Sequence, residues 1–238
     1  MATVKILHFS DSHGRMPRKP SDDYDVIACT GDFMADDDIA WEMAHRGLDR
    51  VPSFKQTKRF QEKWLAENIY SSGRWIGKQP FIWCAGNHDF FDPCEMLRKE
   101  GVEVYDATNC VQHVAGLSWY GFPFINAING YYMYERLASG MLDEAETFIA
   151  RCHDEIGGMP DVLLAHAPLA GLYDEDKHGK RWGNSVLLNK LMYLVADQQR
   201  LPKLFLCGHV HKHGHGAVMN GMRVFNSATT ANIIEVDT

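Results

Sequence analysis

The chain has 238 residues and a mass of 27.0 kDa, which suits one large domain. Hydrophobic residues make up 45% of the sequence and charged residues 23%, so a disordered chain, a collagen and a coiled coil are excluded. With 24 Lys and Arg against 31 Asp and Glu, the formal net charge is -7, and we expect no stable binding to nucleic acid or to an anionic membrane.

Short apolar segments bounded by turn residues predict β-strands along the whole chain. In chain order they are Val4–Phe9, Val26–Cys29, Phe81–Cys84, Val102–Val104, Val111–Val114, Leu117–Tyr120, Val162–Ala165, Leu204–Cys207, Ala217–Met219, Arg223–Phe225 and Ile233–Val236. Amphipathic segments predict helices at Ile39–Gly47, around Phe60 to Ile69, at Leu142–Cys152 and at Val186–Gln199, the last capped by Ser185. This order predicts a layered α/β or α+β fold in a single domain over residues 1–238.

The cysteines and the start of the chain indicate the cellular compartment. Six cysteines are scattered, with no Cys-x-x-Cys pair among them. The first residues lack the cationic and apolar regions of a signal peptide, and no apolar run approaches the ~20 residues of a membrane span. We therefore expect a cytoplasmic protein with free thiols and no membrane partner. Nothing in the sequence indicates its oligomeric state.

Residues that can bind metals directly follow five of the predicted strands. The segments are Asp11-Ser12-His13, Gly31-Asp32, Gly86-Asn87-His88-Asp89, His166 and Gly208-His209-Val210-His211. In sheets fed by strand–helix connections, ligands bind beyond the carboxyl ends of the strands. We therefore expect these side chains, which are distant in sequence, to converge on one place.

Such a cluster of carboxylates and imidazoles would be costly to bury unless cations lay within it. Its donors are oxygen and nitrogen, which suits two divalent ions of Mn, Fe, Zn, Co or Ni, and we favour Mn. Asp32 has two oxygens and can bridge the ions. Asp11 and His13 lie two residues apart on what we take to be an extended segment, so their side chains should point the same way. A turn at His209 and His211 would direct those side chains to different ions.

These motifs, in this order, resemble the calcineurin-like metallophosphoesterase superfamily from Ile6 to about Ser227. Within the superfamily, the chain is most similar to the small phosphodiesterases, including the brain metallophosphoesterase-domain group. The features that carry this similarity are His13-Gly14-Arg15, Asn109-Cys110, Tyr120-Gly121-Phe122-Pro123, His166-Ala167-Pro168-Leu169 and Asn226-Ser227.

The resemblance implies a four-layer αββα sandwich of two mixed β-sheets flanked by helices, with a binuclear metal site at one edge. It implies that Asp32 bridges the ions, that Asp11, His13 and His211 complete one site, and that Asn87, His166 and His209 complete the other. His88 would bind no metal and would give a hydrogen bond or a proton to the leaving oxygen. A hydroxide bridging the ions would attack the phosphorus.

One position departs from the family pattern. The phosphatase branch has an Asp three residues after the bridging one, and that Asp orients the catalytic His. Here this residue is Ala35, and Asp36 follows it. We therefore expect another group to orient His88, and the departure argues against protein-phosphatase activity. We assign Asp36 and the next two aspartates to the start of the following helix.

Two further segments are candidates for substrate contacts. Arg15 follows the first motif and would reach a substrate phosphate; the alternative is a solvated loop arginine. The segment Lys180-Arg181-Trp182 would stack a base and contact a phosphate, or would be a surface loop with a buried Trp. We interpret Asn126 and Asn129 as ordinary loop residues.

The sequence thus predicts a binuclear metal-dependent phosphoester hydrolase, and we expect a phosphodiesterase acting on a cyclic or small nucleotide-like substrate. A phosphomonoesterase or a nuclease would use the same site, although the acidic balance predicts no basic groove for nucleic acid. A non-catalytic scaffold is the alternative of another class. The presence of His88 and of all the predicted ligands argues against a scaffold.

Overall fold

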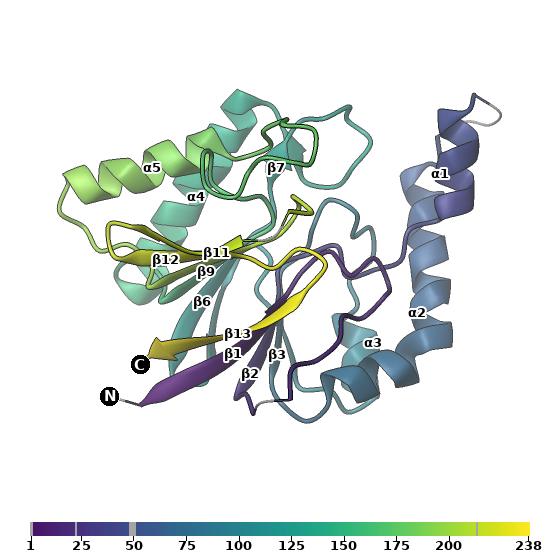
Figure 1. Ribbon diagram of the computed structural model, residues 1–238, viewed down its shortest axis with the longest axis horizontal. Coiled ribbons are helices and arrows are strands. Elements are labelled where there is room, and N and C mark those ends of the chain that lie inside the picture. The colour runs from purple at the N-terminus through teal and green to yellow at the C-terminus, as the bar shows by residue number, and fades with distance from the viewer. Residues whose placement is uncertain (1, 22, 48–50, 213) are drawn as a thin grey trace.

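Two β-sheets form the centre of the computed structural model, which describes residues 2–21, 23–47, 51–212 and 214–238 (Figure 1). The first sheet contains β1 (Thr3–Phe9), β2 (Val26–Cys29), β3 (Phe81–Trp83), β4 (Val104–Asp106) and β13 (Ala231–Asp237). The second contains β5 (Val111–Val114), β6 (Leu117–Phe122), β9 (Val162–Ala165), β10 (Leu204–Cys207), β11 (Gly214–Met219) and β12 (Met222–Asn226). A short pair, β7 (Ile125–Asn126) and β8 (Glu135–Arg136), lies apart from both sheets.

The strand order places parallel strands at the middle of each sheet. The first sheet has the order β13-β1-β2-β3-β4, in which only β13 is antiparallel to its neighbour. The second has the order β11-β12-β10-β9-β6-β5, with antiparallel strands at its two edges. The carboxyl ends of β1, β2, β3, β9 and β10 therefore provide two rows of loops, and these loops carry the predicted ligands.

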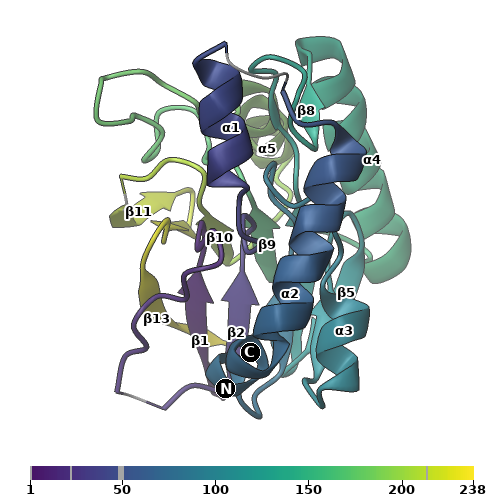
Figure 2. The same cartoon turned by 90° about the vertical axis from the view of Figure 1, so that its right-hand side faces the viewer.

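Helices cover the outer face of each sheet (Figures 1 and 2). α2 (Phe54–Ile76) and α3 (Cys94–Lys99) pack on the first sheet, and α4 (Ala138–Ile156) and α5 (Ser185–Ala196) pack on the second. A third core lies between the sheets and joins residues such as Ile6 and Ala28 to Trp119 and Leu206. These three cores make four layers, which confirms the predicted αββα sandwich.

Four strands have the predicted bounds. Three of them, β2, β9 and β10, are buried along their whole length, and the fourth, β5, is a partly exposed edge strand. The strand predicted at Val102–Val104 instead runs from Val104 to Asp106, and α3 was not predicted because its six residues are too few to show a period. The cap of α5 is Asn184, whose Oδ1 accepts from the Leu187 N–H at 2.8 Å, so the assignment of Ser185 as the cap is wrong.

One further helix, α1 (Asp38–His45), stands at the end of the molecule where the parallel strands finish (Figure 1). Its start is capped by Asp37, whose Oδ1 accepts from the Ala40 N–H at 3.1 Å. The expected capping role of this acidic run therefore belongs to Asp37. Among the described helices, none has the length and the apolar character needed to cross a membrane.

Candidate metal centre

The chain turns sharply where the predicted ligands leave the strands. Asp11, His13, Asp32 and His209 have φ angles of 54°, 43°, 53° and 64°. This left-handed region is uncommon for residues with a side chain, and such strain persists where the surrounding contacts impose it. The expectation of an extended backbone at Asp11 and His13 is therefore wrong. Their side chains converge through left-handed turns, one of which is held by the His13 N–H donating to the Asp32 carbonyl at 2.9 Å.

A close approach of two backbone segments supports this geometry. Gly31 has a φ of 103°, and a Cβ there would lie 2.5 Å from the Gly86 N and Cα atoms. Asp89 is buried below the same turns, and its carboxylate accepts the N–H groups of Asp32 at 2.7 Å, Gly86 at 2.8 Å and Met34 at 3.0 Å. The loops after β2 and β3 are thus locked together by a buried carboxylate and by glycine.

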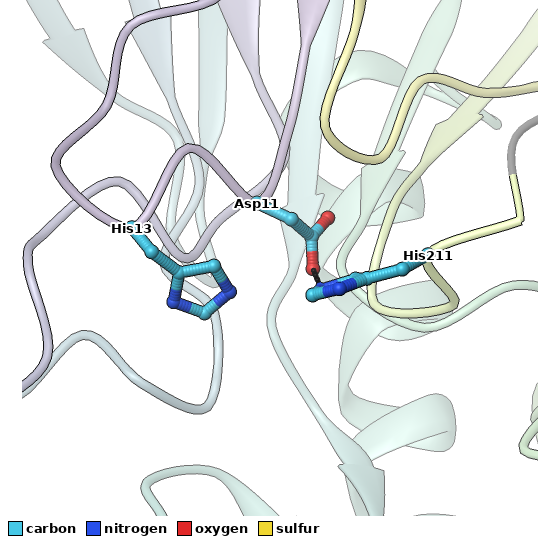
Figure 3. Close-up of side chains that lie close together, drawn as sticks. All are labelled: Asp11, His13 and His211. Carbon is cyan, nitrogen blue, oxygen red and sulfur yellow. Dashed lines mark ion pairs between the residues drawn. The ribbon is translucent and has the colours of Figure 1, made fainter. Parts of the chain in front are cut away.

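Asp11, His13 and His211 form the first group of candidate ligands, with donor atoms that all lie within 4.8 Å of one another (Figure 3). His211 Nε2 is 3.3 Å from Asp11 Oδ1. Asp11 is nearly inaccessible, whereas the His211 side chain is half exposed. A cation would therefore enter this group from the solvent past the exposed His211 side chain.

Asp32 and His166 lie in a second group that also includes Asp11. Asp32 Oδ2 is 3.3 Å from His166 Nε2 and 3.8 Å from His13 Nε2, so this oxygen lies between the two groups. Asn87 Oδ1 is 2.8 Å from His166 Nε2, and the His209 ring centroid is 5.1 Å from that of His166. All seven predicted ligands are therefore close together, with His209 and His211 directed to different groups.

The arrangement around His166 fits a cation. The ring Nδ1 donates to the Thr30 carbonyl at 2.7 Å, which in a neutral imidazole leaves the lone pair on Nε2. That atom faces the oxygens of both Asn87 and Asp32. Three electron-donating atoms that face one point repel each other unless a proton or a metal ion lies among them. Oxygen and imidazole donors such as these suit a divalent metal ion.

The charges of the carboxylates are balanced by imidazoles in the absence of metal ions. Burial would raise the pKa of Asp32, but the charges of His166, His88 and His13 hold it well below its usual range. Burial lowers the pKa of His166, yet the carboxylates of Asp32 and Asp11 raise it to about 9. For His209, burial and the charge of His166 lower the pKa to about 3. We expect metal binding to release the protons of the charged imidazoles.

Asp36 holds the imidazole predicted to act on the leaving group. Its Oδ1 is 2.8 Å from Nδ1 of His88, and its Oδ2 is 2.8 Å from Nδ1 of His13. Burial lowers the pKa of both imidazoles, but Asp32 and Asp36 raise that of His88, and the same two carboxylates with Asp11 raise that of His13 to about 10. From the sequence, the partner of His88 stayed open and Asp36 was assigned to the start of the helix, so this contact was missed. The sequence did contain a signal for this contact, because Asp36 is an aspartate that lies one residue after the expected position, Ala35.

Six of the seven candidate ligands, all except the fully buried His166, line a cleft of about 760 Å³. His88, Arg15 and Asp36 line it, together with Tyr132 and Trp182. The Tyr132 ring lies 4.6 Å from that of His88, a contact that the sequence did not predict. Arg15 is exposed and lies among the residues that line the cleft.

Comparison with known proteins identifies the family of the chain. The sequence model of the calcineurin-like phosphoesterases matches residues 4–213, and the chain therefore belongs to this family. A search of curated protein sequences finds no significant match. Among solved structures, the fold is similar to that of the phosphopantetheinyl hydrolase from Mycobacterium tuberculosis, with a TM-score of 0.51 and 13% identity over 95% of this chain and 89% of that one. Family membership confirms the predicted resemblance to the calcineurin-like superfamily and supports a phosphoester hydrolase.

The position of Asp32 between the two groups generates a metal-binding prediction. We expect Asp32→Asn to weaken both metal sites together, because an amide has one oxygen and no charge. Elemental analysis after dialysis against Mn²⁺ should give well below two equivalents. Asp143→Asn, which removes an exposed carboxylate on α4, is the control and should match the wild type. Two retained equivalents in Asp32→Asn would contradict the bridging role.

A second prediction concerns Asp36. Asp36→Asn replaces one of its two acceptor oxygens by an NH₂ group, so the variant cannot accept from both imidazoles. We expect kcat/KM and Mn²⁺ affinity to fall, each by about 10- to 100-fold, as for other residues that orient metal-site histidines. Asp37→Asn is the matched control, since asparagine caps a helix as well as aspartate does. Wild-type kinetics in Asp36→Asn would show that this carboxylate does not position His88.

Proposed function

We propose that the protein is a binuclear metal-dependent phosphodiesterase that acts on a cyclic or small nucleotide-like substrate. The observation that carries this proposal is the position of His88. Its ring is held by Asp36, and it lies 5.1 Å from His13 between ring centroids, so it borders the candidate metal centre without belonging to the seven predicted ligands. An acid in this place can serve a leaving oxygen while the ligands hold the phosphoryl group.

The charge balance of the cleft favours a small phosphate ester over a nucleic acid. Four carboxylates line it, those of Asp11, Asp32, Asp36 and Asp38. Two divalent cations would neutralise these four charges. His88 carries a further positive charge in the proposed reaction. Together with Arg15, the one arginine or lysine among the described residues of the lining, it would leave a net charge of about two. This small positive charge suits a phosphate ester with one or two negative charges better than a polyanionic nucleic acid.

The shape of the site supports two ester groups. A second hollow of about 440 Å³ adjoins the cleft, and the two share Ile128, Trp182, His209 and His211 in their linings. A substrate with a group on each side of the phosphorus could therefore place one group near His88 and the other near Trp182. A simple phosphomonoester would leave one of these spaces empty.

The chain's own residues have separate parts in the proposed reaction. Two divalent ions in the seven-ligand cage would supply Lewis-acid charge neutralisation and a water molecule of lowered pKa. Arg15 would bind a phosphoryl oxygen. His88, which donates from Nδ1 to Asp36 and carries a second proton on Nε2 in the proposed reaction, would give the Nε2 proton to the leaving oxygen, while Asp36 keeps the ring in place.

We further propose Mn²⁺ as the metal and the cytoplasm as the location. The donors are carboxylate and amide oxygens and imidazole nitrogens, a set that Mn²⁺ accepts. All six cysteines are free thiols, and five of them are buried, which suits a reducing compartment. A scaffold role is the alternative of another class, and the buried, strained geometry at the ligands argues against it.

Hydrolysis of two matched aryl phosphates tests the proposal. With Mn²⁺, the wild type should hydrolyse bis-p-nitrophenyl phosphate with a higher kcat/KM than p-nitrophenyl phosphate. The two adjoining hollows are the reason for this order, because only a diester places a group in each of them, and the released p-nitrophenolate measures both rates. The opposite order would make the protein a phosphomonoesterase. No hydrolysis of either compound with any of the five candidate metals would favour the scaffold.

The role of His88 gives a separate prediction. We expect His88→Ala to retain its metal ions while kcat for the diester falls about 10²- to 10⁴-fold, the usual contribution of a positioned acid. Metal analysis and steady-state kinetics on the same preparation separate the two effects. His113→Ala, at an exposed histidine on β5, is the control. Full activity of His88→Ala would remove His88 from the mechanism.

A further inference from the structure

We propose that Ile128 and Trp182 form a slot for a nucleobase, and that this base belongs to the ester group that stays on the phosphate. This inference rests on the proposed phosphodiesterase function and specifies its substrate class, a nucleotide diester. Trp182 lies in the segment from Lys180 to Trp182, which the metal chemistry does not use.

The indole of Trp182 is held in place by its own loop. Its Nε1 donates to Asp176 Oδ2 at 2.9 Å, and its backbone N–H donates to the Asp174 carbonyl at 2.9 Å. Asp176 Oδ1 also accepts the N–H groups of His178 at 2.8 Å and Lys180 at 3.0 Å. Because the polar atom of the indole already has a partner within the loop, the ring is free to offer its apolar surface to a ligand.

Trp182 and Ile128 lie beside the same passage. Both residues line the metal cleft and also line the adjoining hollow. Their loops are joined at the base, where Asn126 Nδ2 donates to the Gly183 carbonyl at 3.0 Å. Ile128 is 38% exposed, which is high for an isoleucine beside a polar site. The loop before α5, green in Figure 1, lies over the carboxyl ends of the strands in both ribbon views. A flat aromatic group between the two side chains would cover this apolar surface.

One face of the indole is already occupied. Lys180 Nζ lies 3.5 Å from the centroid of the Trp182 ring, a cation–π contact. Lys180 is not among the described residues that line either hollow. The ligand would therefore meet the opposite face of the ring. Every nucleobase has a π-face, and stacking on a fixed aromatic side chain is the usual way in which proteins bind a base without reading its sequence.

The positions of Trp182 and His88 indicate which ester group leaves and which stays on the phosphorus. The Trp182 ring lies 6.1 Å from that of His209, a predicted ligand. His88 instead contacts Asp36 and Tyr132. Since His88 serves the leaving oxygen, the group at Trp182 is the one that stays on the phosphorus. Hydrolysis would break the bond between phosphorus and the oxygen beside His88 and would release an alcohol and a nucleoside monophosphate.

Two diesters with the same leaving group test the slot. Thymidine 5′-(p-nitrophenyl phosphate) and methyl p-nitrophenyl phosphate both release p-nitrophenolate, and only the first carries a base. We expect the Mn²⁺ enzyme to prefer the thymidine ester in kcat/KM by roughly 5- to 150-fold, the range that stacking of one base supplies. Trp182→Ala should bring this ratio close to one, Ile128→Ala should lower it, and Trp182→Phe should keep most of it. Tyr70→Ala, at an exposed aromatic residue on α2, should leave the ratio at its wild-type value.

A binding measurement keeps this test independent of turnover. Calorimetry with the Mn²⁺-loaded protein should show tighter binding of AMP than of ribose 5-phosphate, and Trp182→Ala should remove the difference. If neither diester is hydrolysed but AMP still depends on Trp182, the proposed function is wrong and the slot stands. If both diesters are hydrolysed with a ratio that Trp182→Ala does not change, or if AMP and ribose 5-phosphate bind the wild type equally, the slot is wrong.

Discussion

Two buried carboxylates, those of Asp11 and Asp32, determine how the rest of the site is built. Both are almost inaccessible to solvent, and isolated charges at such positions would each cost several kcal/mol. Hydrogen bonds offset part of this cost. Asp11 accepts the His209 N–H and Asp32 accepts the His88 N–H, each at 2.8 Å. The remaining oxygens face imidazoles. The centre is therefore a place where the fold concentrates negative charge and needs cations to balance it.

The fold can maintain this charge because both sheets contribute to the centre. Asp11 follows β1 of the first sheet and His209 follows β10 of the second, so the hydrogen bond between them joins the two halves of the sandwich. The apolar core between the sheets holds these strands in register, and the left-handed turns at the strand ends direct the side chains inward. Packing energy from the core thus sustains the backbone strain at the ligands.

The layers and the ligand positions could both be predicted from the sequence, because both depend on recognising the buried strands. Fully buried strands appear as short apolar runs, and β2, β9 and β10 were located to the residue. The seven predicted ligands lie next to such runs, so their convergence followed from the topology. The partner of His88, the left-handed backbone at Asp11 and the contact with Tyr132 come from tertiary packing, and no local pattern of residues encodes them.

Asp36 reaches His88 although it lies one residue beyond the position at which the sequence pattern led us to look for an Asp. The loop after β2 is held by Gln61 of α2, which is fully buried and whose Nε2 donates to the Ala35 carbonyl at 3.3 Å and to the His88 carbonyl at 2.6 Å. This side chain fixes the loop of Asp36 against the loop of His88. The carboxylate can then reach the imidazole from one residue later, while Asp37 takes over the helix cap. Because one carboxylate contacts both His13 and His88, a single side chain supports a candidate metal ligand and the imidazole that borders the candidate metal centre.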